Sequence, residues 1–166
     1  MTQISNDTRS FFDLRGGVVS SRSLILSGGA NNTGNGWGAS AGVNVWNGTV
    51  ANDGGNGIWG VLGASTVLTV NGAVSGGTAI TKVGNGKLEL AGASTLSGGI
   101  NAMGGTVKLN YTSQNNSKLA DFAGLTLGGS GATAVQGGAN RGGAGTVFQR
   151  GSTIEISGGN HTEVIS

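Results

Sequence analysis

The chain has 166 residues, of which 36 are glycine, and it contains no proline and no cysteine. Glycine without a three-residue period and without proline excludes collagen, and the lack of cysteine excludes a disulfide framework and thiolate metal sites. The net charge of +2 comes from scattered residues, which does not favour nucleic-acid binding. The composition favours narrow coils that each bury a few aliphatic side chains, with turns made of glycine, asparagine and serine.

Short β-prone runs alternate with these turn residues along the whole chain, which predicts many strands and little helix. No run reaches the roughly 18 apolar residues of a membrane helix, so this segment is not expected to insert into a membrane. In chain order we expect a strand at residues 11–14, a run at 18–26, loops at 31–38 and 52–57, an apolar run at 58–62 and one helical turn at 117–122.

Apolar residues two positions apart are expected to point to the inner side of each strand. These inward pairs are Leu24 and Leu26, Val43 and Val45, Leu68 and Val70, Leu88 and Leu90, Val107 and Leu109, Leu125 and Leu127, and Ile154 and Ile156. Successive pairs are 19, 25, 20, 19, 18 and 29 residues apart. A spacing near 19 predicts one all-β domain over residues 1–166, a right-handed parallel β-helix (β-solenoid) of roughly eight coils.

Residues 76–109 carry the most regular pattern, in which Leu88 and Leu90 alternate with Lys87 and Glu89. This stretch resembles the strand repeat of autotransporter passenger domains and related bacterial extracellular proteins. The shared positions are Thr81, Lys82, Gly84, Gly86, Leu88, Leu90, Gly92, Thr95, Ser97, Gly98, Gly99, Gly105, Thr106 and Leu109. The stretch departs from the repeat at Leu96, where an aromatic residue is usual, and at Val107.

The resemblance implies a β-helix outside the cell or on a bacterial cell surface, within a longer repeat protein. It implies no particular activity, because the repeat is a scaffold. We therefore expect a structural, adhesin-like segment that is not an enzyme and needs no cofactor.

Two short motifs suggest chemistry but lack the surroundings that the chemistry requires. Residues 38–42 match G-x-S-x-G, yet a nucleophile elbow needs a following helix and a histidine base, and the only histidine is His161 near the C-terminus. Residues 55–60 match G-x-G-x-x-G, yet a strand-like run follows where a dinucleotide site needs a helix. The first match is attributed to chance in a chain with 36 glycines, and the second is interpreted as a turn.

The acidic residues form no close pair of the kind that glycoside hydrolysis requires. They are Asp7, Asp13, Asp53, Glu89, Asp121, Glu155 and Glu163. Residues 52–57 are similar to calcium-binding nonapeptide repeats, but Trp59 stands where the ligating aspartate would be. We expect no metal site and no catalytic residues.

Trp37, Trp46 and Trp59 are the three tryptophans, and they allow two interpretations. They either pack inside the N-terminal coils, which we favour, or form an aromatic platform for glycans, which would make the chain a carbohydrate-binding module. A third alternative is a fibre subunit, because no polar cap is evident at either end of the expected solenoid. The expected partners are neighbouring solenoid segments or copies of the chain joined end to end into a filament, and surface glycans in the second alternative.

Overall fold

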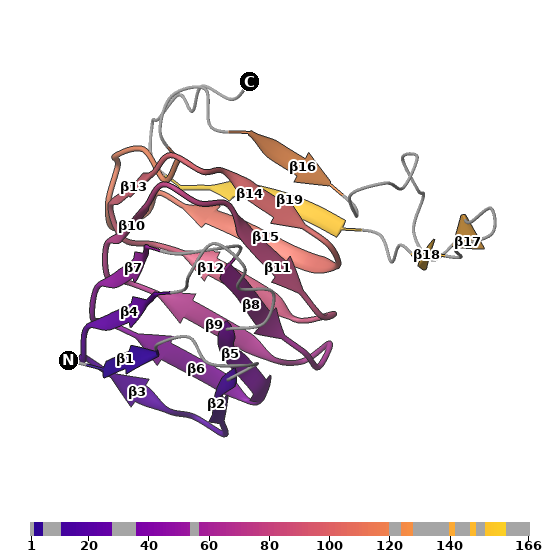
Figure 1. Cartoon of the computed structure of the whole chain (residues 1–166), viewed down its shortest axis with the longest axis horizontal. Helices are drawn as coiled ribbons and strands as arrows, with labels where there is room; N and C mark the ends of the chain where they lie inside the picture. Colours follow the sequence, from indigo (N-terminus) through magenta and orange to yellow (C-terminus); the bar gives the residue numbers. More distant parts are fainter. Residues whose placement is uncertain are drawn as a thin grey trace.

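A computed structural model describes residues 2–4, 11–27, 36–53, 57–119, 124–127, 140–141, 147–148 and 152–158. Within these ranges the regular structure is entirely β, so none of them includes a helix that could span a membrane. The chain winds repeatedly through three sheets of parallel strands, and its successive coils stack from the N-terminal strands upward (Figure 1). The structure is a parallel β-solenoid.

Each sheet collects one strand from every coil, where a coil is one circuit through the three sheets. Sheet A consists of β1 (Thr2–Ile4), β4 (Leu24–Leu26), β7 (Val50–Asn52), β10 (Val74–Gly76) and β13 (Ser94–Leu96). Sheet B consists of β2 (Phe11–Arg15), β5 (Gly36–Ala41), β8 (Gly57–Val61), β11 (Ile80–Val83), β14 (Ile100–Ala102) and β16 (Leu125–Leu127). Sheet C consists of β3 (Val19–Ser20), β6 (Val43–Trp46), β9 (Val67–Val70), β12 (Lys87–Leu90), β15 (Gly105–Asn110) and β19 (Ser152–Ser157). A separate antiparallel pair is formed by β17 (Asn140–Arg141) and β18 (Val147–Phe148).

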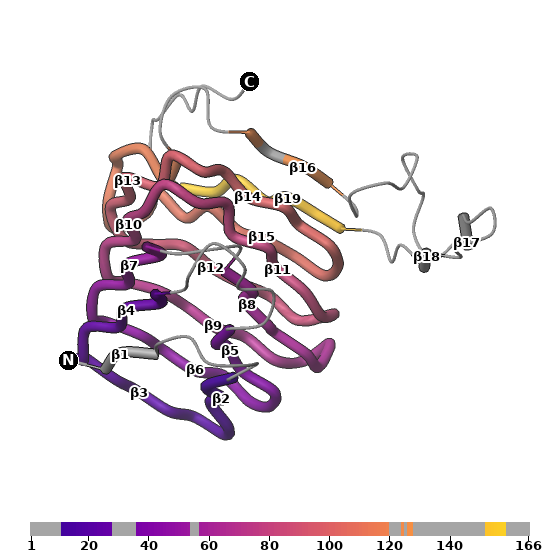
Figure 2. Tube along the Cα trace, in the orientation of Figure 1, coloured from indigo at the N-terminus to yellow at the C-terminus, as the bar shows by residue number. Residues whose placement is uncertain are grey.

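Strands β4 to β15 make four complete coils, and the outermost strands bring the sheets to five or six strands each. The expected eight coils are therefore not confirmed. The expectation treated every inward pair as one coil, but the pairs come from three different sheets. Leu24 and Leu26 lie in sheet A and Leu127 in sheet B, whereas Leu88 and Leu90 lie in sheet C. The tube in Figure 2 follows the same path without the strand arrows.

The core of sheet C is a pair of columns that run across the coils. Leu88 pairs with Leu68 on one side and with Val107 on the other, and all three side chains are completely buried. Val70, Leu90 and Leu109 form the second column in the same way. Because a parallel in-register sheet keeps each side chain above its equivalent in the coil below, every coil buries apolar surface against its neighbours.

Strand β6 does not follow the expected pattern, because Val43 and Val45 lie on the outer side of sheet C. Val43 is 59% exposed, while Asn44 and Trp46 are the buried residues of this strand. The Asn44 amide nitrogen donates to the carbonyl oxygens of Ala41 and Gly42, and its Oδ1 accepts the Val18 N–H. These bonds satisfy a polar side chain inside the solenoid, so a register judged by hydrophobicity alone is wrong by one residue.

The last strands of sheets B and C also depart from the expected core. Ile154 is half-buried and packs against the core, whereas Ile156 is 56% exposed and Leu127 is 53% exposed. Of Leu125, only the position in the strand is described. Leu127 pairs with the buried Ala102, and Ile156 pairs with a buried core residue as well. Both exposed side chains thus take inward register positions at the end of the stack.

Two expected local elements differ from the structure. Residues 36–38 of the expected loop at 31–38 belong to strand β5, and residues 31–35 lie outside the described ranges. Residues 117–119 of the expected helical turn are not helical, and residues 120–122 again lie outside the described ranges. Residues 111–119 instead run over the end of sheet A, where the Ser94 N–H donates to the Ser117 carbonyl oxygen.

The corner between sheets C and A repeats a glycine that no other residue can replace without moving the coils apart. A Cβ atom on Gly48, Gly72 or Gly92 would overlap the backbone of the preceding coil. Beside this glycine, the Asn71 amide nitrogen donates to Asn47 Oδ1 of the coil below at 2.9 Å. The high glycine content thus has a physical reason at this corner, where successive backbones lie in direct contact.

Replacing Gly72 with alanine is expected to destabilise the protein by about 1–3 kcal/mol or more, because the new methyl group overlaps the Gly48 carbonyl oxygen. Gly77→Ala is the matched control, since the nearest atom to a Cβ there is Ser97 Oγ at 4.0 Å. The control should change stability by no more than about 0.5 kcal/mol. Urea unfolding of both variants measures the difference, and equal effects would contradict the tight corner.

Candidate functional site

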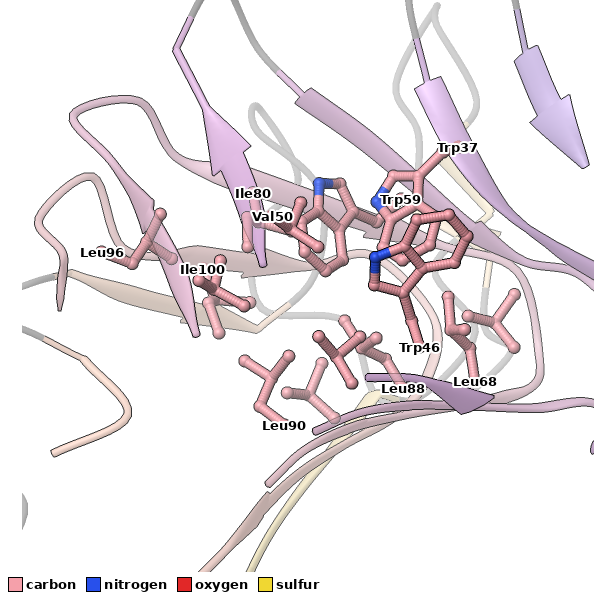
Figure 3. Close-up of a cluster of buried hydrophobic side chains, with 14 of the residues drawn as sticks. Trp37, Trp46, Val50, Trp59, Leu68, Ile80, Leu88, Leu90, Leu96 and Ile100 are labelled. Carbon is pink, nitrogen blue, oxygen red and sulfur yellow. The ribbon is translucent and has the colours of Figure 1, made fainter. Parts of the chain in front are cut away.

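The largest side chains inside the solenoid are the three tryptophans. Trp37 of β5, Trp46 of β6 and Trp59 of β8 are each at most 1% exposed. The ring of Trp37 lies edge-on to the other two, with centroids 5.2 Å from Trp46 and 5.0 Å from Trp59. The ring of Phe12 lies against Trp46 with the same geometry at 6.0 Å. Figure 3 shows the indoles side by side within the cluster of aliphatic side chains.

The glycan platform expected as an alternative for the tryptophans is therefore wrong. The outward positions beside Trp37 are Gly36 and Gly38, and those beside Trp59 are Ile58 and Gly60, so both indoles point into the solenoid. Among the described residues, none of the three indole N–H groups has a hydrogen-bond acceptor. Rings of this size can be buried in the N-terminal coils because the interior there is wide enough to hold them in edge-to-face contact.

Tryptophan emission is expected to be blue-shifted and insensitive to acrylamide or to added oligosaccharides, because all three indoles are shielded from solvent. Fluorescence of the native chain and of the chain unfolded in guanidinium measures this. Free N-acetyltryptophanamide is the exposed reference. Emission at the wavelength of that reference, before denaturant is added, would contradict the interior position.

A charged residue also lies within the solenoid. Lys82 of β11 takes the inward position between Trp59 and Ala102 on the paired strands, and it is completely buried. Its ammonium group donates to the carbonyl oxygens of Gly84 at 2.6 Å and Gly104 at 2.7 Å, so it connects two successive coils. The sequence could have indicated this position, because Lys82 follows the inward Ile80 by two residues.

Burial lowers the pKa of Lys82 from 10.5 to about 8. The unfolded chain therefore binds more protons than the folded chain between these two values, so stability should rise as the pH increases from about 8 to about 10.5. The rise should reach at most about 3 kcal/mol. Urea midpoints at several pH values measure it. Lys82→Met should remove this rise and Lys87→Met should keep it, and parallel profiles for wild type and Lys82→Met would contradict the assignment.

Ser40 of the G-x-S-x-G motif is bound to a carboxylate rather than activated by a base. The Ser40 hydroxyl and N–H donate to Asp13 at 2.7 and 2.8 Å, and Arg15 Nε donates to the same carboxylate at 2.6 Å. Burial alone would raise the pKa of Asp13, but the hydrogen bonds from Arg15 and Ser40 outweigh it and hold the pKa below its usual value. After Gly42 the chain enters strand β6, and His161 lies outside the described residues. This arrangement is a structural link between β2 and β5.

The described carboxylates that lie near one another are on the outer face of sheet C. Lys108 Nζ lies 3.6 Å from Glu89 and 3.7 Å from Glu155, and Lys87 Nζ lies 3.6 Å from Glu155. Lys87 and Glu155 are 39% and 40% exposed, and an ion pair this accessible to solvent contributes about 0–1 kcal/mol. The structure thus places Glu89 and Glu155 in a surface ladder of alternating charge.

The remaining candidates for chemistry lie apart from one another or beyond the described ranges. Asp53 is exposed at the end of β7, while Asp7, Asp121 and Glu163 lie outside the described residues. The G-x-G-x-x-G match is not the expected turn, because its residues 57–60 belong to strand β8 and are followed by strand β9, while residues 55 and 56 lie outside the described ranges. Across the part of the chain that the structure describes, no three histidine, cysteine or acidic residues gather as metal ligands would.

The fold and these contacts define the chain as a parallel β-solenoid with a filled interior. It is similar to the adhesin BmaC autotransporter of Brucella suis biovar 1 (strain 1330), with 39% identity over 72 residues. The matched stretch covers 40% of this chain and 2% of that protein. No family model and no solved structure matches the chain.

Proposed function

We propose that this chain is a structural segment of an extracellular or cell-surface bacterial protein, built as a right-handed β-helix and similar to part of an autotransporter adhesin. The segment carries load and sets distance, and it has no chemistry of its own. The observation that supports this role is the set of unbroken inward columns, such as Leu68, Leu88 and Val107, that join successive coils.

The similarity to an autotransporter adhesin supports the surface location and the scaffold role together. A solenoid suits such a role because each coil folds on its neighbour. Coils can therefore be added to the length by repetition, and each packs its core residues in the same way. The interior is occupied by leucine, valine and tryptophan side chains, while the outer face of sheet C carries paired charges. Stability and extension are therefore what this architecture provides.

Deletion of one coil tests the role directly. Val67 pairs with Lys87, so removing residues 67–86 deletes twenty residues and one complete circuit, and brings β12 next to β6 in register. The shortened chain should still unfold cooperatively and should be about 4.8 Å shorter by small-angle scattering. A modular scaffold tolerates this loss.

Deletion of residues 67–76 is the matched control, because ten residues are half a circuit and place the following strands in the wrong sheets. This variant should unfold at a much lower denaturant concentration or fail to fold. If the twenty-residue and ten-residue deletions disrupt the protein equally, the scaffold proposal is wrong.

A further inference from the structure

The upper end of the stack exposes two apolar residues that occupy core positions. Leu127 of β16 continues the column that contains Trp59, Lys82 and Ala102 of sheet B, and Ile156 of β19 continues the column that contains Leu109 of sheet C. Ala102 and Leu109 are completely buried, whereas Leu127 and Ile156 are more than half exposed. Along these two columns, the inward side chains are buried in the coils that a further coil covers.

Sheet A ends differently from sheets B and C. Above β13, the Ser117 carbonyl oxygen accepts the Ser94 N–H, and Lys118 Nζ donates to the carbonyl oxygen of Ala91 at 3.0 Å. Tyr111 and Leu119 of the same segment are each 1% exposed. This segment closes sheet A, so the contact surface at the upper end is made by β16 and β19. Both are the last strands of their sheets and present one edge without a described neighbour.

The lower end of the stack carries the start of the same columns. Phe12 of β2 pairs with Trp37, which pairs with Trp59. Phe12 and Val18 are partly buried and pack against the core. A second copy placed on the same axis would therefore bring Phe12 over Leu127 and continue the sheet B column with another apolar residue.

We propose that the β16–β19 end binds the β2–β3 end of a second copy of this chain, so that sheets B and C continue from one molecule into the next. The contact repeats the stacking that already joins successive coils, with parallel strands and a continuous apolar column in sheet B, while the sheet C column that ends at Ile156 begins at Ser20 of β3. It uses different surfaces on the two partners, so it does not close on itself and gives filaments. The small net charge of +2 opposes such association only weakly.

Sedimentation velocity over a concentration series, with negative-stain imaging, tests the proposal on the full chain. Wild type should shift to larger species as the concentration rises. The double variant Leu127→Asp with Ile156→Lys should remain monomeric, and because both side chains are exposed its melting temperature should stay close to that of wild type. Thr153→Lys is the control, since Thr153 is an exposed outward residue of the same strand, and it should assemble as wild type does.

Mixing distinguishes head-to-tail addition from other contacts. The double variant keeps its β2–β3 end, so a small fraction of it should add to wild-type filaments, stop their growth and shorten them. A contact between two identical ends would leave wild-type filaments unchanged by the variant. A wild type that is monomeric at every concentration, a double variant that assembles normally, or filaments of unchanged length in the mixture would each overturn the proposal. The coil-deletion test of the scaffold role does not depend on any of these three results, because it measures folding and not association.

Discussion

Replacing Trp59 with alanine is expected to lower the free energy of unfolding by about 3–5 kcal/mol. The indole is completely buried, and it lies between Trp37 and Lys82 on the paired strands of sheet B. Its removal leaves a cavity that the neighbouring side chains cannot fill, because the hydrogen-bonded register fixes the distance between coils. Loss of the 5.0 Å contact with Trp37 adds to this cost. Urea unfolding followed by circular dichroism gives the change.

Leu62→Ala is the control for this variant. Leu62 follows the same strand, but its side chain is 47% exposed, so the expected change is no more than about 0.5 kcal/mol. The loss of stability in Trp59→Phe should fall between the losses in Trp59→Ala and Leu62→Ala, since phenylalanine keeps an aromatic ring and loses part of the volume. A Trp59→Ala variant as stable as Leu62→Ala would show that the indole does not fill the core.

Much of sheet C could be predicted from the sequence, because its strands alternate cleanly. In β12 the apolar Leu88 and Leu90 are separated by the charged Glu89, and β15 repeats the arrangement around Lys108. Where one face is apolar and the other charged, a shift of one residue would bury a charge, so the register has a single low-energy solution. These are also the positions that resemble the autotransporter strand repeat.

The register was less predictable where both faces of a strand are uncharged. In β6 the residues Val43, Asn44 and Val45 suggest valines inside, but the hydrogen bonds of Asn44 to the adjacent turn reverse the choice. Lys82 is the opposite case, a charged residue inside because two backbone carbonyl oxygens receive its ammonium group. The inward positions of both residues depend on backbone carbonyl acceptors that either lie far along the chain or are placed by the shape of a turn. The sequence alone does not show such acceptors.

The division into three sheets was not predictable from the spacing of apolar pairs. Coil length varies. Leu24 pairs with Val50 after 26 residues and Val50 pairs with Val74 after 24, whereas Lys87 pairs with Thr106 after only 19. Insertions at corners lengthen a coil without changing the stacking, because the loop lies outside the sheets. A constant period therefore describes sheet C in the middle of the chain and fails toward both ends.

Replacing Leu88 with alanine is expected to cost about 2–5 kcal/mol, the range for a buried leucine. Leu88 is completely buried between Leu68 and Val107, at the centre of the sheet C column. In a repeat architecture the stability depends on contacts between neighbouring coils, so a cavity at this position weakens the coupling of the coils on both sides. The unfolding transition should become less cooperative as well as shift to a lower urea concentration.

Lys87→Ala is the matched control, one residue away on the opposite face of the same strand. Its side chain is 39% exposed and lies 3.6 Å from Glu155, a partner that is itself accessible to solvent. Losing such a pair should cost no more than about 1 kcal/mol and should matter less at high salt, because ions screen it. Unfolding curves of both variants at low and high salt separate the two effects. Similar losses for Leu88→Ala and Lys87→Ala would mean that the strand is not turned as described, and that the column from Leu68 to Val107 does not hold the coils together.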